Sequence, residues 1–269
     1  MQLLNSISLT SHVHNWLGNS CQPRLLHVFD QACNLINERR EVLSIVTPQI
    51  GNGPFNLVVE SDVLFPDFLD VETTILIQDR HLRLGELTIT AANTTIWDPR
   101  PPWDVLHMHR ADILFQLMQL RIPTDESLIT QFSDFSKSLL PADLPSVLRL
   151  IPRIAGLGVG LTPSGDDFIL GGIYAAWIIH APETAGPFNH AIANTAAPLT
   201  TSLSAAWLES AGRGEAGILW HAFFDALISG QPVHIDQSVK NILAIGETSG
   251  ADALAGFLSI FQLWKQEQA

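Results

Sequence analysis

Cysteine and basic residues are scarce in this sequence, and each scarcity excludes a class of protein. Its two cysteines, Cys21 and Cys33, form no Cys-x-x-Cys pair, which excludes a disulfide framework and favours a reducing compartment. Only 14 lysines and arginines oppose 27 acidic residues, giving a formal net charge of -13. Such an acidic chain is a poor ligand for nucleic acid or for an anionic membrane surface.

Long apolar runs and targeting signals are also missing. The longest apolar run, residues 168–179, is too short to cross a bilayer and indicates a buried helix. The first residues lack a basic region followed by an apolar one, so a secretory signal is not expected and we predict a cytoplasmic protein. Ten histidines are present, but their spacing does not match a zinc site.

The first hundred residues have the pattern of a small β domain. Short segments rich in β-branched residues are separated by turn signals at Asn37-Glu38, 51–54, Pro66-Asp67 and Asp79-Arg80. The expected strand segments are 25–36, 42–48, 55–61, 73–79, 81–90 and 93–98. This spacing predicts a small antiparallel barrel or sandwich. Within it, 51–54 is interpreted first as a hairpin turn and second as a ligand loop.

A proline-rich connector, residues 98–103, separates this part from a helical second half. We therefore predict an α+β protein with a β-rich domain at 1–100 and an α-helical domain at 101–269. Helical periodicity places the helices at 104–121, 125–139, 143–153, 164–180, 187–211, 215–229, 235–244 and 249–266.

The strongest functional signal is the glycine-rich loop 156–167, which opens the buried helix. Its glycines allow backbone to approach a ligand, and its helix start offers N–H groups and a positive dipole end to an anion. Thr162 or Ser164 could cap this helix, and capping alone is the competing interpretation. The candidate residues of this loop are Gly158, Gly160, Thr162, Ser164, Gly165, Asp166 and Asp167.

A second segment, 246–256, repeats the same pattern of residues. Both segments share the frame Ser-Gly-x-Asp-x-x-x-Gly, which begins at Ser164 in the first and at Ser249 in the second. We hypothesise that the two helix starts face one pocket and hold a small anionic or phosphorylated ligand, although two separate capping boxes would give the same pattern. The second segment contributes Thr248, Ser249, Gly250 and Asp252 as candidates.

Roles can be assigned to these residues from their chemistry. Asp166 and Asp167 are the expected catalytic carboxylates, and Asp167 with Asp252 would be the ligands if Mg²⁺ is bound. Thr200, Thr201 and Ser202 could bind substrate or instead bond to their own helix. Arg213 could pair with a carboxylate or phosphate, or simply face solvent.

Four stretches of the chain, 27–36, 51–59, 156–172 and 246–257, resemble a bacterial family first catalogued as a domain of unknown function and linked to AllH. AllH is a subunit of oxamate carbamoyltransferase, which serves allantoin degradation and purine catabolism. The resemblance implies carbamoyl transfer, converting oxalurate and phosphate into oxamate and carbamoyl phosphate. It also implies a hetero-oligomer with AllF-like and AllG-like subunits, and it brings no catalytic residue with it.

Three functions stay open at this point. The first is a carbamoyltransferase subunit acting on a small anionic metabolite, with chemistry outside the Ser-Thr-Arg-Thr loop of ordinary carbamoyltransferases, which this sequence lacks. The second is a non-catalytic anion-binding or assembly subunit. The third, a Mg²⁺-dependent phosphotransferase, has no nucleotide-binding signature in its favour.

Overall fold

The computed structural model describes residues 2–61, 63–78, 81–91, 94–119, 122 and 125–268. The chain divides into two compact units, Met1–Pro99 and Arg100–Ala269. Within the described residues, no helix is both long and apolar enough to cross a membrane. Both cysteines are free thiols, Cys33 buried inside the first unit and Cys21 on its surface.

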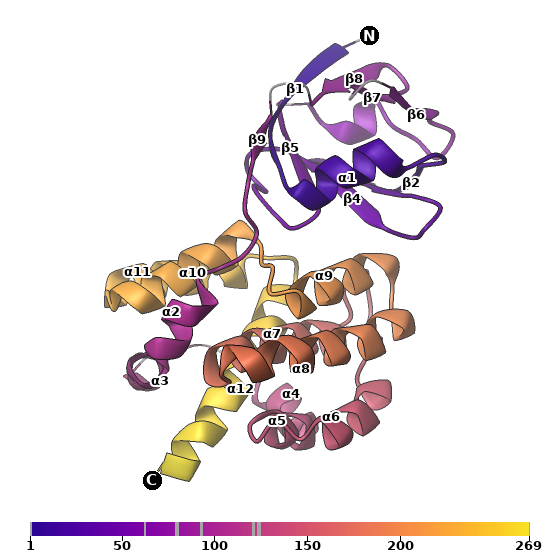
Figure 1. Ribbon diagram of the computed structural model, residues 1–269. Helices are drawn as coiled ribbons and strands as arrows, with labels where there is room; N and C mark the ends of the chain where they lie inside the picture. Colours follow the sequence, from indigo (N-terminus) through magenta and orange to yellow (C-terminus); the bar gives the residue numbers. More distant parts are fainter. Residues whose placement is uncertain are drawn as a thin grey trace. The chain divides into compact units, whose positions relative to one another are not determined.

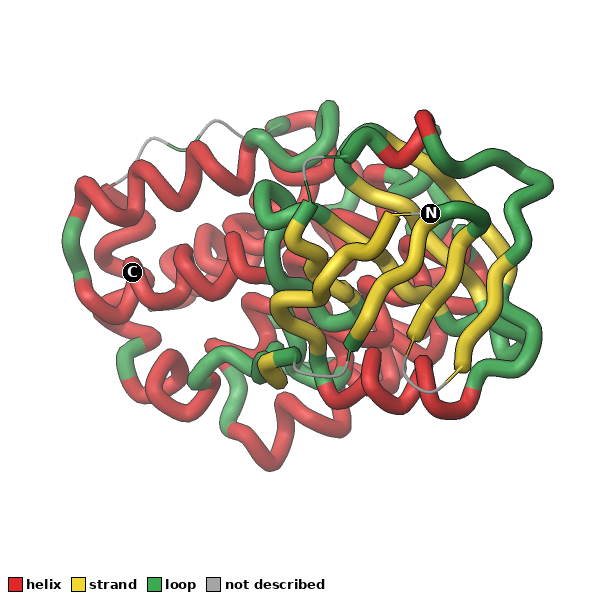
Figure 2. The backbone as a smooth tube through the Cα atoms, turned by 90° about the horizontal axis from the view of Figure 1, so that it is seen from above, coloured by secondary structure: helices red, strands yellow, loops and turns green. Residues whose placement is uncertain are grey.

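One mixed sheet forms the first unit (Figures 1 and 2). Its described strands follow the order β2-β3-β4-β5-β1-β8-β7-β6, and β9 pairs with β1. The sheet closes almost completely into a barrel, as expected for this half of the chain. The strands are β1 (Gln2–Leu9), β2 (Arg24–Phe29), β3 (Ala32–Ile36), β4 (Val42–Val46), β5 (Asn56–Glu60), β6 (Ile75–Gln78), β7 (His81–Leu84), β8 (Leu87–Thr90) and β9 (Thr95–Ile96).

Strand pairing in this barrel is only partly antiparallel. Strand β1 runs parallel to β8 and β9, and β4 runs parallel to β5. The hairpin predicted at 51–54 is therefore wrong, because this segment lies in a connection between two parallel strands. Asn37-Glu38 does join an antiparallel pair, whereas Pro66-Asp67 lies in the 3-10 helix η1 (Phe65–Asp67). The turn predicted at Asp79-Arg80 lies outside the described residues.

The barrel core depends on two elements that the periodicity did not reveal, β1 and the helix α1 (Ser11–Asn19). Thr10 caps α1 by accepting a hydrogen bond from the Val13 N–H, and Trp16 is buried in the barrel core. The indole N–H of Trp16 donates to the Glu41 carbonyl, so the ring is packed and its polar edge is satisfied. A helix of 9 residues, about two and a half turns, gives too short an apolar pattern to stand out in the sequence.

The second unit is helical, as expected (Figure 1). Its described helices are α2 (Trp103–Met108), α3 (Arg110–Gln119), α4 (Glu126–Gln131), α5 (Ser133–Leu139), α6 (Leu144–Leu150), η2 (Ile151–Arg153), α7 (Ser164–Ile179), α8 (Pro182–Ala196), η3 (Ala197–Leu199), α9 (Ser202–Gly212), α10 (Ile218–Ser229), α11 (Pro232–Leu243) and α12 (Ser249–Gln268).

Three predicted helices are each split in the structure, and one of them, 125–139, breaks at Phe132 into α4 and α5. The segment 104–121 breaks at His109 into α2 and α3, and its last two residues lie outside the described part. The segment 187–211 breaks between α8 and α9, where η3 carries Pro198. Proline lacks the N–H that a continuing helix requires. The small residues around Pro198 favour a helix, so the sequence pattern did not reveal the break.

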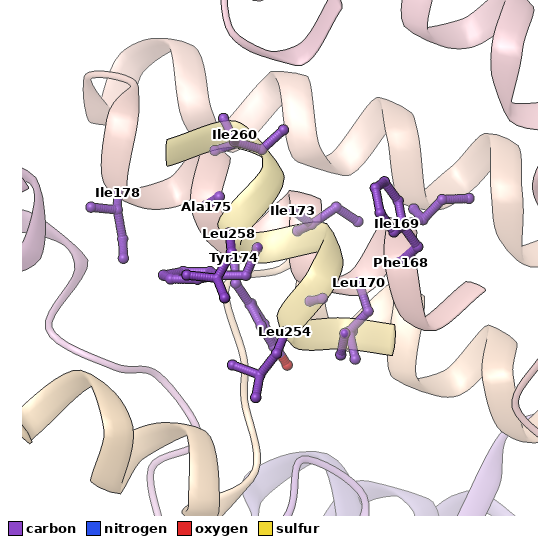
Figure 3. Packing of buried hydrophobic residues seen from close by; sticks show 14 of the residues in the cluster. Phe168, Ile169, Leu170, Ile173, Tyr174, Ala175, Ile178, Leu254, Leu258 and Ile260 are labelled. Atoms are coloured by element: carbon purple, nitrogen blue, oxygen red, sulfur yellow. The ribbon is translucent and has the colours of Figure 1, made fainter. Parts of the chain in front are cut away.

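Helices α7 and α12 pack side by side at the centre of this unit (Figures 1 and 3). Their close contact depends on one glycine from each helix. A Cβ atom at Gly171 would lie 1.8 Å from the Ala253 carbonyl oxygen, and one at Gly256 would lie 2.1 Å from the Phe168 carbonyl oxygen. Glycine is thus required at both positions so that the two backbones can touch.

Apolar side chains fill the space around this contact. Tyr174, Ile173 and Leu254 are among those that Figure 3 labels, and all three are buried. Phe257 continues the cluster from α12 toward Trp220 and Phe223 of α10. Burying an apolar side chain of this size contributes about 1.5–3 kcal/mol to the unfolding free energy. The packed helix pair therefore fixes the positions of the residues at the starts of α7 and α12.

Candidate functional site

The start of α7 is not capped by a side chain, contrary to both predicted capping arrangements. Pro163 is the N-cap residue, and Ser164 is already helical. The N–H groups of Asp166 and Asp167 donate to the Pro163 carbonyl at 2.9 and 3.2 Å, and that of Gly165 donates to the Leu157 carbonyl at 2.9 Å. Capping therefore does not account for the hydroxyls and carboxylates gathered here.

The glycine loop before α7 has a backbone that only glycine adopts readily. Gly156, Gly158 and Gly160 have φ values of 74°, 128° and 91°. A Cβ at Gly158 would lie 2.7 Å from the Ser164 nitrogen, so the loop folds back against the helix start. Among the described residues, none accepts a hydrogen bond from the N–H groups of 158–161, and these remain available to a ligand.

Asp166 has a structural role in this loop. Its Oδ1 accepts from the Gly156 N–H at 2.8 Å, and its Oδ2 accepts from the Thr200 hydroxyl and, at 2.8 Å, from the Ser204 hydroxyl. The carboxylate is 1% exposed. These three hydrogen bonds use both oxygens of the buried carboxyl group and leave it little capacity to bind anything else.

The two helix starts meet, as the repeated frame predicts. The hydroxyl oxygens of Thr162 and Ser249 lie 2.7 Å apart, which joins the loop before α7 to the first residue of α12. Asp167 and Asp252 are both buried, with 7% and 5% exposure. Within the described part of the chain, the Oδ2 atom of each has no hydrogen-bond partner. Two unpartnered carboxylate oxygens thus lie at one junction.

Burial raises the pKa of Asp167 to about 8, and the nearby negative charges of Asp252 and Asp166 add to the shift. The hydroxyls of Ser249 and Thr162 oppose the shift by hydrogen bonding to the charged form. Asp167 is consequently protonated over much of the range around neutral pH. A carboxyl group in that state can both donate and accept a proton near pH 7.

The remaining elements of the shared frame are packing residues. A Cβ at Gly165 would lie 2.1 Å from the Ile154 carbonyl oxygen, and one at Gly250 would lie 1.8 Å from the Ile242 carbonyl oxygen. The Gly250 N–H donates to the Ile245 carbonyl at 3.1 Å. These two glycines hold each helix start against the segment before it, and their ligand role stays a prediction.

Thr201 and Ser202 lie at a helix start and not inside a helix, because 187–211 is interrupted. Thr201 caps α9 by accepting from the Ser204 N–H at 3.1 Å, and its hydroxyl donates to the Leu161 carbonyl at 2.5 Å. It therefore ties α9 to the glycine loop. Ser202 is the first residue of α9, and Thr248 accepts the Asp252 N–H at 2.9 Å through its carbonyl.

One partner of the site, Ser204, was not among the predicted site residues, whereas Thr200 was predicted as a candidate for binding substrate. Both donate to Asp166. Their spacing of four residues places them near each other across the start of α9, a signal that is readable only once the break before that helix is known. The assumption of one long helix concealed it.

Asp167 and Asp252 are the predicted ligands if Mg²⁺ is bound, and their two unpartnered oxygens are of the chemical type that Mg²⁺ prefers. Asp166 could not join them, since its oxygens already accept three hydrogen bonds. In the part of the chain that the structure describes, no group of three or more His, Cys, Asp or Glu side chains is arranged to hold a metal. The junction offers two protein ligands.

Comparison with known families agrees with the resemblance of the two glycine-containing helix starts. The family described as oxamate carbamoyltransferase subunit AllH matches residues 154–261, and the AllH family N-terminal domain matches residues 5–96. The chain belongs to the AllH family. The AllH match begins at Ile154, just before the glycine loop, and ends inside α12, so it spans both helix starts. No solved structure matches this AllH chain.

Proposed function

We propose that this AllH-family chain is the subunit of a carbamoyltransferase that binds the carbamoyl-bearing substrate between the starts of α7 and α12. The reaction is the one implied by the resemblance, in which oxalurate and phosphate give oxamate and carbamoyl phosphate. The observation that carries the proposal is the pair of buried carboxylates, Asp167 and Asp252, each with an unpartnered oxygen.

Unpartnered buried acceptors favour a ligand that carries N–H groups. An unsatisfied buried acceptor costs about 1–3 kcal/mol, which a donor from the ligand would recover. The carbamoyl end of oxalurate has an amino group and an amide N–H, both of them donors. A phosphate facing the same carboxylates would be repelled, so the phosphate belongs on the other side of the junction, at the N–H groups of 158–161.

The proposed chemistry assigns a proton to Asp167. A phosphate oxygen attacks the carbamoyl carbon, the bond from that carbon to the amide nitrogen breaks, and the nitrogen leaves as the amide of oxamate after gaining a proton. Neutral Asp167 supplies that proton as a general acid, and in the reverse direction its carboxylate removes it. N–H groups of the glycine loop stabilise the charge that develops on the carbamoyl oxygen.

The other predicted residues take supporting roles in this proposal. The hydroxyls of Thr162 and Ser249 hold Asp167 in place, and Ser164, Thr248 and Ser202 border the ligand. Gly158 and Gly160 keep the loop N–H groups open to the phosphate. Asp166, first predicted as catalytic, positions the loop. AllF-like and AllG-like subunits would complete the enzyme in the cytoplasm.

The test is turnover by the assembled complex. We expect Asp167→Asn to lower kcat for oxalurate phosphorolysis by about 10²–10⁴-fold, the usual contribution of a general acid. Asp134→Asn, which removes an exposed aspartate from α5, is the matched control and should leave turnover unchanged. Unchanged turnover in Asp167→Asn would exclude the catalytic role.

The alternative function is a non-catalytic anion-binding or assembly subunit. The free N–H groups of 158–161 favour it equally, because they bind an anion without a general acid. It predicts that Asp167→Asn leaves turnover unchanged while Gly160→Ala weakens phosphate binding measured by calorimetry. The catalytic proposal predicts instead that Asp167→Asn lowers turnover more than Gly160→Ala does.

Mg²⁺ is a second way to satisfy the two unpartnered oxygens. Mg²⁺ is commonly held by one or two carboxylates together with water and substrate phosphate. If it binds here, Asp167 and Asp252 are its protein ligands, and calorimetric titration with Mg²⁺ alone should give a binding curve in the wild type and none in Asp252→Asn. Equal turnover with and without a chelator would remove Mg²⁺ from the proposal.

A further inference from the structure

A cavity lies in the helical unit, away from the two helix starts. It has a volume of about 510 Å³ and is lined by Arg100, Pro101, Pro102, Trp103, Asp104, Val105, Trp177, Pro182 and Arg213. Trp177 follows Asp167 by ten residues on the same helix, which separates the cavity from the carboxylate junction by about 15 Å along α7. The volume is that of a small-molecule site.

Two indole rings form one wall of this cavity. Trp103 and Trp177 stack at 5.7 Å with an interplanar angle of 20°. Their N–H groups are already satisfied, because Trp103 donates to the Gly214 carbonyl at 2.7 Å and Trp177 donates to the Ala211 carbonyl at 2.9 Å. The rings are thereby fixed in orientation, and the surface they offer to the cavity is aromatic.

Gly214 is the residue that allows both rings to come so close. Its φ is +78°, and a Cβ there would lie 2.9 Å from Trp103 Nε1 and 3.2 Å from Trp177 Cζ2. The preceding residue, Arg213, is thus carried to the cavity by a turn that only glycine permits. Of the two alternatives predicted for Arg213, the structure shows pairing with a carboxylate, that of Glu215, and the residue also lines the cavity.

The Arg213 guanidinium is held rigidly from one side. Its Nε and Nη2 donate to Glu215 Oε2 at 3.2 and 2.8 Å, and Nη2 also donates to the Ser210 hydroxyl at 3.0 Å. Among the described residues, nothing accepts from its Nη1 group. A pre-oriented guanidinium with an unused edge is suited to a carboxylate or phosphate.

Charge and shape together define the ligand. Arg100 and Arg213 are two of only 14 basic residues in an acidic chain, and both line one cavity beside a fixed aromatic wall. We propose that this cavity binds a small aromatic anion, a flat conjugated ring that carries a carboxylate or phosphate group. The ring lies against the indoles, Arg213 and Arg100 bind the anionic group, and Asp104 accepts from ring N–H groups.

The experiment is isothermal titration calorimetry on the full chain with two probes: adenosine 5′-monophosphate, whose conjugated base carries a phosphate through its ribose, and orotate, whose conjugated ring carries a carboxylate directly. At least one should bind with a Kd below about 1 mM. The tighter of the two identifies the anionic group. Adenosine and inorganic phosphate should each bind at least about tenfold more weakly than the better probe, since each lacks half of the recognised chemistry.

Variants locate the binding. Arg213→Gln and Arg100→Gln should each weaken the better probe about tenfold or more, because each loses a charge-assisted hydrogen bond. Arg100 is exposed, so its variant tests the cavity even if Arg213→Gln fails to fold. Lys240→Gln, which removes an exposed cation from α11, is the matched control and should bind normally. The proposal is overturned if neither probe binds, if phosphate alone binds equally well, or if both arginine variants bind like the wild type.

Discussion

Helices α7 and α12 begin with the same Ser-Gly-x-Asp residues, but the start of α7 is also hydrogen-bonded to the region around the start of α9 through a side chain that α12 lacks. At the third position of the frame α7 has Asp166, which accepts from Thr200 and Ser204 around the start of α9, whereas α12 has Ala251. The segment before α7 is a long glycine loop, and the one before α12 is short. The two helices thus share close-packed glycines and a buried aspartate. Helix α7 differs in that a long glycine loop precedes it.

The largest effect should come from breaking the shared frame at the helix contact. Gly171→Ala places a Cβ on the Ala253 carbonyl, and overpacking of this severity costs at least about 3 kcal/mol of unfolding free energy. Gly256→Ala should cost a similar amount because its contact with Phe168 is equivalent. Urea unfolding measures both.

The control for these two variants is Gly186→Ala in α8. Its new Cβ would meet only Trp177 at 3.7 Å, an ordinary contact, so the helix should gain about 0.5–1 kcal/mol from the substitution. If Gly171→Ala were as stable as Gly186→Ala, the close contact between α7 and α12 would be incorrect.

Asp166→Ala makes the start of α7 resemble that of α12. The variant loses three hydrogen bonds and leaves the buried Ser204 hydroxyl without its acceptor, which should cost about 2–3 kcal/mol. The loop 156–160 should also become easier to cleave by a protease, since Asp166 holds the Gly156 N–H. Equal cleavage rates in the variant and the wild type would show that the loop is ordered by something else.

Asp167→Asn should change the pH dependence of stability. The folded chain keeps the Asp167 proton up to about pH 8, whereas an ordinary aspartate loses it near 3.8. The unfolded state therefore binds fewer protons between these values, and stability falls as the pH rises through that window, by up to about 1.4 kcal/mol per pH unit. Below about pH 4 the carboxyl group is protonated in both states, so it no longer makes the unfolding free energy depend on pH.

The asparagine variant cannot titrate and should lose this slope. Urea unfolding at about pH 5 and about pH 7.5 should show that the unfolding free energy of the variant increases relative to that of the wild type as the pH rises. Parallel stability curves for the two proteins would mean that Asp167 is ionised normally in the folded state.

The smallest effect is expected in the loop that only α7 possesses. Gly160→Ala meets no atom within 4 Å, so its cost is the strain of a positive φ alone, about 1 kcal/mol. Gly158→Ala should cost more, because its Cβ would also meet the Ser164 nitrogen at 2.7 Å. A reversed order in thermal unfolding would contradict the described fold-back of the loop.

The sequence predicts some parts of this protein well and others poorly, for physical reasons. The buried helix α7 and the repeated frame could be predicted because apolar runs and Ser-Gly-x-Asp spacing are local signals. The roles of Asp166 and Asp167 were not, since adjacent identical residues differ only in which distant groups they meet. Asp166 meets three donors from outside its helix, and Asp167 meets another carboxylate.

Non-local pairing explains the errors in the β-rich unit as well. The segment 51–54 has the composition of a hairpin turn, but whether the flanking strands run parallel depends on which strands become neighbours. Strand β1 was missed although it is central to the sheet, because its alternation is masked by serines and an asparagine that its neighbours accommodate. Register and direction are tertiary properties that composition does not encode.

The glycine contact between α7 and α12 also limits how this chain can evolve. Each glycine faces the partner backbone four residues into the other frame, Gly171 against Ala253 and Gly256 against Phe168. A larger residue at one position would push the helices apart and separate the two aspartates at their starts. We therefore expect positions 171 and 256 to vary together or not at all among relatives, and recombination between them to be tolerated only when both frames come from compatible parents.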